Sequence, residues 1–519
     1  MTTRFAKCTS LADVYVRTCK WKGEHVLFAD DHGGSYTGRQ ALDRSLRFAA
    51  AMRGVSLVPG DVVAFLCMGS ASQTAAWFGA VAGGYVASSL HTRNDSVAQV
   101  AIALKWLGAK LLVHDEAFAS LAAAAVQQAG MPIRTLALDD EAGSWATFAD
   151  AASPLDYERD RPDAEAVAAI ILSSGSTGKP KGVMHSQASL LACAVAGQVM
   201  LEGIHRHDTI LIPMNPSFAG WVMFVLAAMA GQARLLFVRR FEAASVVELA
   251  ERERVTILNM VPTMWRMVFD VVTPERDFTS VRLTCVGGEL PTPEDISRIT
   301  ARFCKRVSAI YMAGESGNAC AITVTAEDMA DGGKVGSTGL PTVGADLRIV
   351  DPDGSIDDVL PPGQRGEIVV TGASVALGYW REPALTAKKF VYGWWRSGDM
   401  GHLDEDGYLW MSGRADNVIN TGGIKVHAEE IEAEISTHEH VAACAVVGCT
   451  DAKFGQRIEA YIVASNPGLT ADSLKAYLKN VRQLSAHKVP KAFHFLAALP
   501  IGLTGKIDRR ALRARSESA

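Results

Sequence analysis

The stretch Ser173-Ser-Gly-Ser-Thr-Gly-Lys-Pro-Lys-Gly-Val183 directly follows the apolar run Val167–Leu172. Its glycines allow backbone conformations that other residues resist, and its hydroxyls and N–H groups suit phosphate oxygens. Lys179 and Lys181 add positive charge. The spacing is not that of a P-loop, and Pro180 prevents a helix from running through the stretch. We therefore expect a phosphate-holding loop at the end of a strand, with a flexible surface turn as the alternative.

Strand-like and helical patterns alternate around this stretch over most of the first 340 residues. The alternation predicts an α/β fold of stacked layers with mostly parallel sheets. The expected strands are Val62–Leu66, Leu111–Val113, Val167–Leu172, Thr209–Ile212, Leu235–Val238, Thr256–Asn259 and Leu283–Val286, and the expected helices include Ser245–Arg254 and Pro293–Cys304.

The pattern changes between Val343 and about Trp410, where turn sequences separate short alternating strands. This predicts a small antiparallel, barrel-like section. Short strands and helices then return, so we place a domain boundary near residue 414. Residues 1–414 form the large N-terminal domain in this interpretation, and residues 415–519 form a small, mobile α+β domain. Its expected elements are Glu429–Ser436 and Ala471–Leu484 as helices, and Ala442–Val447 and Ile458–Ala464 as strands.

Bulk properties exclude several classes of protein. The 519 residues allow more than one domain, and a net charge of -5 gives no reason to propose a nucleic-acid partner. The nine cysteines are scattered without zinc-ligand spacing, as expected of reduced thiols. The apolar stretch Gly220–Val238 is interrupted by Gln232 and Arg234, so we expect a buried helix and strand rather than a membrane span. We expect a cytoplasmic location, since the N-terminus lacks the apolar core of a signal peptide.

Further motifs follow the first one in a fixed order. Together they resemble the adenylate-forming superfamily of acyl-CoA synthetases, peptide-synthetase adenylation domains and beetle luciferases, over roughly residues 30 to 512. The matching segments are Ser173–Val183, Val286-Gly-Gly-Glu-Leu-Pro291, Tyr311-Met-Ala-Gly-Glu315, Gly366–Gly372 with Gly378-Tyr-Trp380, Trp395-Arg-Ser-Gly-Asp399, Gly413-Arg-Ala-Asp416 with Gly422-Gly423 and Glu430-Ile-Glu432, and Thr504-Gly-Lys-Ile-Asp-Arg509.

The resemblance implies attack by a carboxylate on the α-phosphate of ATP, which gives an acyl-adenylate and pyrophosphate. Two anions must meet in this step, so a cation is needed where they touch. The resemblance places the ammonium of Lys506 there, and a preorganised donor of this kind is worth roughly 3–4 kcal/mol. Taken alone, Lys506 would be read as a solvated lysine in a turn. The expected small molecules are ATP, Mg²⁺, a carboxylic acid and coenzyme A.

The resemblance also assigns the nucleotide site. Glu315 is the expected Mg²⁺ ligand, helped by the hydroxyl of Thr177. Asp399 would accept hydrogen bonds from the ribose hydroxyls and Arg414 would donate from the other side, although each of these charged residues could instead form a surface ion pair. The remaining predicted ATP or AMP contacts are Ser173, Ser174, Gly175, Ser176, Gly178, Lys181, Gly287, Gly288, Glu289, Tyr311, Met312, Ala313 and Gly314.

Two residues depart from the family pattern. Met312 stands where the family has Gly, and Gly314 stands where it has the Thr that contacts the α-phosphate, so one hydroxyl donor is missing. Because residues that flank Tyr311 line the acyl pocket in the family, Ile310 and Met312 favour a narrow, apolar pocket. The other residues expected to line it are Trp221, Met223, Val261, Asn318 and Ala319.

The resemblance further implies that the small domain takes two orientations, one for each half-reaction. Asp416 is the expected hinge, since such movements rest on a few boundary residues. Gly422 and Gly423 would line the tunnel for the pantetheine arm of coenzyme A, where a narrow thiol passes close to the backbone.

One position, Ala219, argues against one branch of the family, the members that activate amino acids. Amino-acid-activating members hold the substrate's ammonium with an Asp just after a Phe, but here Ala219 follows Phe218, and an unpaired buried ammonium is costly. The expected function is therefore acyl-CoA synthesis from an apolar acid. Loading of a carrier protein, and a nucleotide-binding homologue without catalysis, remain as alternatives. A homodimer is expected only by analogy with relatives.

Overall fold

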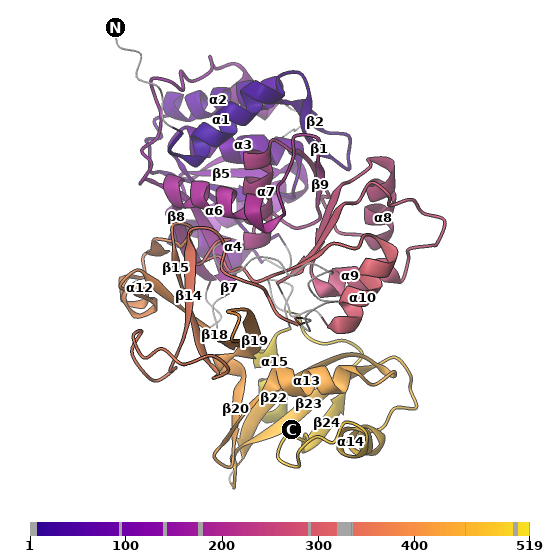
Figure 1. Ribbon diagram of the computed structural model, residues 1–519. Helices are drawn as coiled ribbons and strands as arrows, with labels where there is room; N and C mark the ends of the chain where they lie inside the picture. The colour runs from indigo at the N-terminus through magenta and orange to yellow at the C-terminus, as the bar shows by residue number, and fades with distance from the viewer. Residues whose placement is uncertain are drawn as a thin grey trace. The chain divides into compact units, whose positions relative to one another are not determined.

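The computed structural model describes residues 8–92, 96–138, 143–174, 180–288, 292–318, 334, 336–451, 453–501 and 507–517. The chain packs into two compact units (Figure 1). The larger unit comprises residues 1–347 and 370–395, and the smaller one comprises residues 348–369 and 396–519.

The larger unit contains a first seven-stranded sheet in the order β13-β12-β11-β9-β10-β1-β2. Its neighbours are parallel except for the antiparallel pair β1–β2. The strands are β1 (Val26–Asp30), β2 (Ser35–Thr37), β9 (Thr209–Ile212), β10 (Arg234–Phe237), β11 (Ile257–Met260), β12 (Leu283–Gly287) and β13 (Val307–Ile310).

A second seven-stranded sheet has the order β16-β8-β7-β4-β3-β5-β6. It is parallel from β7 to β6, whereas β8 runs antiparallel to both β7 and β16. Its strands are β3 (Val62–Leu66), β4 (Val86–Ser89), β5 (Leu111–Asp115), β6 (Arg134–Leu138), β7 (Val167–Ser174), β8 (Pro180–Ser186) and β16 (Gly378–Tyr379).

Helices form layers with these two sheets. Helices α3 and α7 each contact strands of both sheets, so they lie between them. This confirms the stacked α/β layers that the alternating pattern predicts. The helices of the larger unit are α1 (Leu11–Lys22), α2 (Gly38–Gly54), α3 (Ala71–Ala82), α4 (Val97–Leu107), α5 (Ala119–Ala129), α6 (Gln187–Met200), α7 (Ala219–Gly231), α8 (Ala243–Arg252), α9 (Pro262–Phe269), α10 (Pro293–Arg302) and α12 (Pro383–Lys389).

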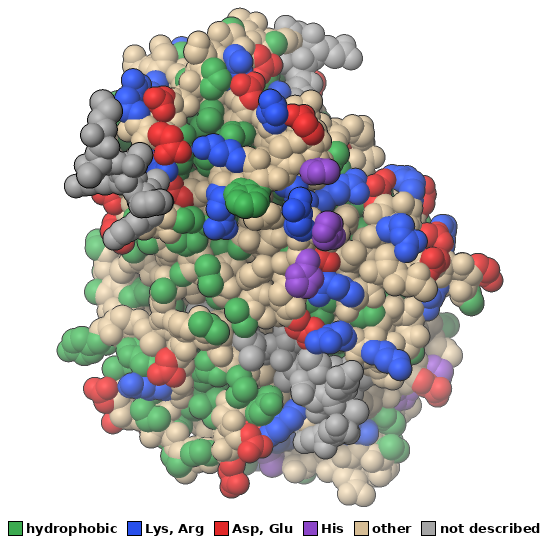
Figure 2. Space-filling view, turned by 45° about the horizontal axis from the view of Figure 1, so that its top comes forward, with side chains coloured by type: hydrophobic (Ala, Val, Ile, Leu, Met, Phe, Trp, Pro, Cys, Tyr) green, Lys and Arg blue, Asp and Glu red, His purple; other side chains and the backbone are tan. Residues whose placement is uncertain are grey.

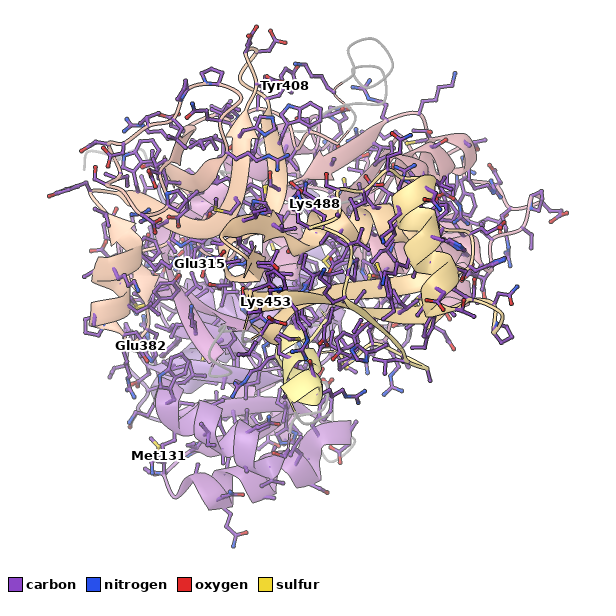
Figure 3. The ribbon with its side chains drawn as sticks, turned by 90° about the horizontal axis from the view of Figure 1, so that it is seen from below. Met131, Glu315, Glu382, Tyr408, Lys453 and Lys488 are labelled. Atoms are coloured by element: carbon purple, nitrogen blue, oxygen red, sulfur yellow. The ribbon has the colours of Figure 1, made fainter. Side chains whose placement is uncertain are left out.

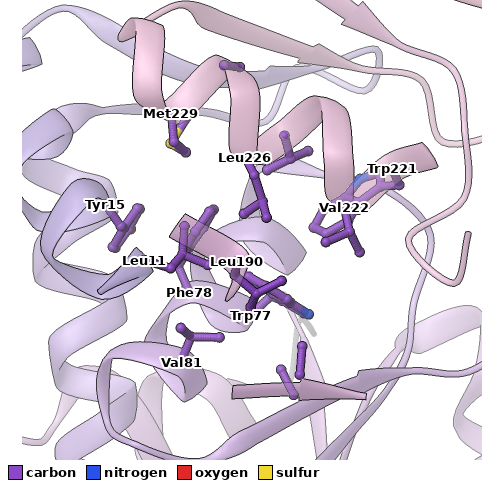
Figure 4. Close-up of a cluster of buried hydrophobic side chains, with 14 of the residues drawn as sticks. Leu11, Tyr15, Trp77, Phe78, Val81, Leu190, Trp221, Val222, Leu226 and Met229 are labelled. Atoms are coloured by element: carbon purple, nitrogen blue, oxygen red, sulfur yellow. The ribbon is translucent and has the colours of Figure 1, made fainter. Parts of the chain in front are cut away.

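The core between the two sheets is built around aromatic side chains (Figure 4). Trp77 of α3 meets Trp221 of α7 edge to face, with ring centroids 5.9 Å apart. Tyr15 of α1 stacks on Phe78 at 4.2 Å. Helix α7 is buried along almost its whole length, which explains its nearly continuous apolar sequence. None of the helices in the described ranges combines the length and the apolar character needed to cross a bilayer.

A third sheet has the strand order β14-β15-β18-β17, with β19 beside β18. Strand β18 runs antiparallel to both β17 and β19. The antiparallel section expected after residue 343 is therefore confirmed. Its strands are β14 (Ala345–Val350), β15 (Gly366–Gly372), β17 (Phe390–Val391), β18 (Trp394–Leu403) and β19 (Leu409–Arg414).

A fourth sheet, with five strands in the order β21-β20-β23-β22 and β24 paired to β23, lies in the smaller unit. Its apolar core includes Ile431 of α13 and Leu474 of α14, both fully buried. The elements are β20 (Val418–Thr421), β21 (Ile424–His427), α13 (Ala428–Ser436), β22 (Val441–Asp451), β23 (Gly455–Ala464), α14 (Ala471–Asn480), β24 (Ala492–Phe495) and α15 (Arg509–Glu517).

The expected elements are present, but several ends differ from the prediction. Helix α8 ends at Arg252 rather than Arg254, and α14 ends at Asn480 rather than Leu484. In both cases a residue beyond the helix takes a left-handed conformation, with φ of +48° at Arg254 and +53° at Gln483. Residues other than glycine rarely adopt this conformation. Because neither position is a glycine, the sequence pattern does not indicate where these helices end. Strand β22 reaches Asp451 because it pairs with β23 along its whole length.

Candidate active site

The glycine-rich stretch lies on a hairpin of β7 and β8. Ser173 pairs with Lys181 and Ser174 pairs with Pro180, so the two strands close on the loop between them. The residues Gly175, Ser176, Thr177 and Gly178 of that loop lie outside the described residues, as do the side chains of Ser173 and Ser174. Pro180 begins β8, so the proline that excludes a helix here opens a strand instead. The Lys181 ammonium lies 5.7 Å from the centre of the Tyr379 ring.

Glu315, labelled in Figure 3, comes five residues after the end of strand β13 at Ile310 and lies in a short loop. The loop is tight, because the Gly317 N–H donates to the Ala313 carbonyl at 2.9 Å. The Tyr379 hydroxyl donates to Oε1 of Glu315 at 2.9 Å. The carboxylate is therefore held by a side chain from β16, a strand that pairs with β8.

A buried histidine joins the same loop to β8. His185 is fully buried, and its Nε2 lies 2.7 Å from the Gly314 carbonyl oxygen. Its Nδ1 lies 3.1 Å from the hydroxyl of Ser189 on α6. Burial lowers the pKa of His185 to about 4, so the ring is neutral at neutral pH.

Neither His185 nor Tyr379 is assigned a role by the motifs. The segment Gly378-Tyr-Trp380 matches the family pattern, but the match gives Tyr379 no function. His185 lies two residues past the end of the glycine-rich stretch at Val183. Alternation along β8 is the signal that could have found His185. Val183 and His185 are two residues apart and so share one face of the strand, the face that meets the Glu315 loop.

Gly314 leaves room where the family has a threonine. A Cβ atom at this position would lie 3.6 Å from Val183 and 3.9 Å from both Ala219 and Ile171, which is ordinary contact. Gly314 is also not among the described residues with positive φ. The glycine is therefore not required by the backbone or by close packing.

The expected adenine-side loop follows β12. Gly287 packs against the next strand so closely that a Cβ would lie 2.8 Å from the Ile310 carbonyl oxygen. Gly288 has φ of +84°, a conformation that favours glycine, and a Cβ there would lie 3.2 Å from Val261. Glu289 lies outside the described residues. The structure thus brings both glycines against two residues of the predicted acyl pocket.

The other residues of the predicted acyl pocket lie in different surroundings. Ile310 is buried at the end of β13, and Met312 and Val261 are partly buried. Asn318 is fully buried and donates to the Cys193 carbonyl at 2.9 Å. Trp221 and Met223 are fully buried members of the core between the sheets. Ala319 falls outside the described part of the chain.

The two expected ribose contacts meet in the smaller unit. Asp399 of β18 pairs with Arg414 of β19 in the strand register. The Arg414 guanidinium donates to Oδ1 of Asp399 at 2.8 Å, and Asp399 is buried while Arg414 is about half exposed. The Ser397 hydroxyl accepts from the Asp399 N–H at 2.8 Å. Sequence motifs 15 residues apart are thus joined by a hairpin.

Gly422 and Gly423 form the two-residue turn between β20 and β21, where Thr421 pairs with Ile424. Their φ angles are +62° and +84°. A two-residue hairpin turn with both central residues at positive φ is the type that favours glycine or asparagine. The glycine pair therefore has a conformational reason of its own. The expected hinge residue Asp416 lies between β19 and β20. Its Oδ2 lies 3.7 Å from a guanidinium nitrogen of Arg414.

Lys506 lies outside the described residues, but both flanks of its segment are described. Ile501 and Ile507 form an isolated antiparallel bridge. Arg509 donates from one nitrogen to both carboxylate oxygens of Glu432, each at 2.7 Å. Glu432 also accepts from the Val446 N–H at 2.7 Å. The segment's C-terminal flank is thus fixed to α13 and β22.

The donor set around Glu315 fits a magnesium ion that arrives with a nucleotide. Mg²⁺ is usually held by one or two carboxylates together with substrate phosphates and waters, not by a cage of protein ligands. In the described ranges, no three His, Cys, Asp or Glu side chains gather as a metal cage. The single carboxylate of Glu315, held by the Tyr379 hydroxyl, agrees with an ion that is bound mainly by phosphates and waters.

Comparison with known proteins places the chain in a family. The model of the AMP-binding enzyme family matches residues 16–380, and that of the AMP-binding enzyme C-terminal domain matches residues 430–506. A feruloyl-CoA synthase of an Amycolatopsis species is 32% identical over 493 residues, covering 93% of this chain and 95% of that protein. The fatty acid–[acyl-carrier-protein] ligase ScoC of Streptomyces coeruleorubidus is 29% identical, covering 93% and 92%.

Among solved structures, ATP-bound MatB from Rhodopseudomonas palustris has a TM-score of 0.86 and 25% identity, covering 98% of this chain and 99% of that one. The chain belongs to the AMP-binding enzyme family and is an ATP-dependent acid–CoA ligase by class. Enzymes of this class use ATP, Mg²⁺ and coenzyme A.

Proposed function

We propose that the protein is an acyl-CoA synthetase that activates an apolar carboxylic acid. The observation that carries the proposal is the arrangement around β8. Its hairpin bears the glycine-rich loop, and the carboxylate of Glu315 is held at 2.9 Å by Tyr379 of the neighbouring strand. A strand that follows the glycine-rich loop in the chain, together with a carboxylate held in place from the next strand, suits a magnesium–nucleotide complex.

In the first half-reaction, a carboxylate oxygen of the acid attacks the α-phosphorus of ATP. The bond between the α- and β-phosphates breaks, and pyrophosphate leaves with the electron pair. Lys506 would hold the two reacting anions together, and Thr177 with its neighbours would hold the phosphates. Asp399 and Arg414 would bind the ribose. Bound at Glu315 with the nucleotide, Mg²⁺ supplies charge neutralisation for the phosphates.

In the second half-reaction, the thiol of coenzyme A loses its proton and the sulfur attacks the acyl carbon. The bond to the phosphate oxygen breaks and AMP leaves. Gly422 and Gly423 would border the path of the thiol arm. Movement of residues 415–519 about Asp416 between the two half-reactions remains part of this proposal.

The acyl pocket is proposed to be narrow and apolar. Support comes from the packing of Val261 beside Gly288 and of Ile310 beside Gly287, which fills the ends of three neighbouring strands with aliphatic groups. Met312, Asn318, Trp221, Met223 and Ala319 complete the proposed set. Strong preference for broad bicyclic acids over alkyl or single-ring acids would contradict it.

The acceptor is tested by measuring pyrophosphate and AMP release with a panel of acids, with and without coenzyme A. We expect acid-dependent pyrophosphate release, and turnover to AMP that requires coenzyme A. Pyrophosphate release without an effect of coenzyme A would favour carrier-protein loading, the activity in the name of one relative. No acid-dependent signal would favour a nucleotide-binding homologue. A cytoplasmic location and a homodimer remain predictions.

A further inference from the structure

The protonation of His185 follows from its partners. A carbonyl oxygen can only accept a hydrogen bond, so Nε2 carries the proton that points to Gly314, 2.7 Å away. In the neutral ring Nδ1 is then the acceptor, and the Ser189 hydroxyl 3.1 Å away is placed to donate to it. The Ser186 carbonyl at 3.2 Å competes for the same hydroxyl proton. His185 thus donates through Nε2 to the loop that carries Glu315.

The loop that carries Glu315 is held through its main-chain carbonyls. Those of residues 313–318 all accept hydrogen bonds, from partners in several parts of the larger unit. Among these donors in the described chain, the ring of His185 is the one that comes from β8. The donors are the Gly317 N–H to Ala313, His185 to Gly314, the Ala376 N–H to Glu315, the Ser374 hydroxyl to Ser316, the Ser316 hydroxyl to Gly317 and the Thr342 hydroxyl to Asn318.

Strand β8 holds Glu315 at two points. The side chain is reached through Tyr379, which pairs with Val183 of β8 and donates to Oε1 of Glu315. The main chain is reached through His185, which binds the carbonyl of the preceding residue. Because a trans peptide is planar, fixing the Gly314 carbonyl also fixes the direction of the Glu315 N–H. Strand β8 begins at Pro180, directly after the glycine-rich loop in the chain. Both points of attachment are therefore on the strand that follows this loop.

We propose that His185 is a positioning residue that couples the phosphate-loop hairpin to the carboxylate of Glu315. The coupling ties the direction of the Glu315 carboxylate to strand β8, the strand that follows the glycine-rich loop in the chain. This inference rests on the proposed function only in that Glu315 faces the nucleotide's Mg²⁺. Loss of groups that orient a metal-binding side chain typically costs roughly 10- to 100-fold in metal affinity or activity.

The matched variants are His185→Gln and His185→Asn. The glutamine amide reaches approximately as far as Nε2, whereas the asparagine amide is one methylene shorter. The control is Thr18→Val, which removes another fully buried hydrogen bond from a side chain to a carbonyl, 2.7 Å long, to Met229. It lowers stability without touching β8 or the Glu315 loop. Thermal unfolding confirms that each variant is folded.

The measurement is calorimetric binding of α,β-methylene-ATP, with and without MgCl₂. The bond between its α- and β-phosphorus atoms and the bridging carbon does not cleave, so this analogue cannot transfer its adenylyl group to an acid. Mg²⁺ should tighten binding to the wild type, to His185→Gln and to Thr18→Val by similar factors. His185→Asn should lose roughly tenfold or more of that tightening. The proposal is overturned if His185→Asn keeps the full effect, if Thr18→Val loses as much, or if Mg²⁺ has no effect on the wild type. Because this readout needs no acid, failure of the proposed acid activation in the pyrophosphate assay is a separate result.

Discussion

Single residues decide how this site differs from the family pattern. Gly314 removes a hydroxyl donor, but the space beside Val183, Ala219 and Ile171 is open enough for a Cβ. The packing therefore does not explain the glycine. His185 and Tyr379 show the opposite case, because their contacts at 2.7 and 2.9 Å hold Glu315 although the motifs assign neither residue a role.

Gly314→Thr should restore the missing donor. Because a Cβ makes only ordinary contacts at this position, we expect a change in unfolding free energy below about 1 kcal/mol. The rate of acid-dependent pyrophosphate release should rise roughly 10- to 100-fold, since hydrogen bonds to charged groups are worth about 1.5–3 kcal/mol and about 1.4 kcal/mol is a factor of ten in rate. Gly314→Val has the same shape without the hydroxyl and is the control. Equal rates for the two variants would show that no phosphate contact is formed.

Protonation of His185 should make stability depend on pH. Its pKa is about 4 in the folded protein and about 6.5 in an unfolded chain. The unfolded state therefore binds more protons between these values, and stability falls as pH is lowered from about 6.5 to 4. The slope approaches 1.4 kcal/mol per pH unit, for a total of roughly 3 kcal/mol.

The measurement compares urea unfolding of the wild type and His185→Gln between pH 7 and pH 4. Glutamine does not titrate, so the difference in unfolding free energy between the two proteins should shrink in that range. A constant difference would mean that the ring is not held neutral in the folded state.

At the level of elements, strand pairing explains most of the site. The hairpin β7–β8 presents the glycine-rich loop, and the hairpin β18–β19 brings Asp399 to Arg414. The turn between β20 and β21 requires positive φ at Gly422 and Gly423. Figure 2 shows Lys, Arg, Asp and Glu side chains interspersed over the face in view.

The variant Gly423→Asn distinguishes two roles of this glycine, its conformational role in the turn and its proposed role beside the thiol arm of coenzyme A. Asparagine tolerates the left-handed conformation, and a Cβ at Gly423 meets no atom within 4 Å. We expect a loss of unfolding free energy of at most about 1 kcal/mol. Adenylate formation should be unchanged, whereas thioester formation from a supplied acyl-adenylate and coenzyme A should slow at least about tenfold.

The control for this variant is Gly407→Asn, at another turn glycine of the smaller unit with φ of +85°. Both half-reactions should be unaffected in it. Unchanged thioester formation in Gly423→Asn would remove the glycine pair from the coenzyme A path.

For the whole molecule, residues assigned to one reaction belong to two units. Glu315, Tyr379 and His185 belong to the larger unit, and Asp399 and Arg414 belong to the smaller one. Lys506 is also a residue of the smaller unit by sequence. The two-orientation hypothesis predicts that it serves only the adenylation step.

Lys506→Ala should slow adenylate formation from acid and ATP by a few hundred-fold, the effect of removing a preorganised donor of roughly 3–4 kcal/mol. Thioester formation from a supplied acyl-adenylate should be largely spared. The two half-reactions are measured separately, by pyrophosphate release and by acyl-CoA formation. Lys488→Ala, which breaks an ion pair with Glu430 in the same unit, is the control. Equal loss of both half-reactions in Lys506→Ala would contradict the two-orientation hypothesis.

The sequence alone determined the layered α/β fold, the order of its motifs and the family. These depend on local patterns, namely the period of apolar residues and the mix of glycine, hydroxyl and lysine in short loops. The tertiary structure alone decided that His185 meets Gly314, 129 residues away, and that Tyr379 meets Glu315, 64 residues away. The physical reason is that periodicity specifies which face of a strand is buried but not which strands pair. Pairing of β8 with both β7 and β16 creates these contacts.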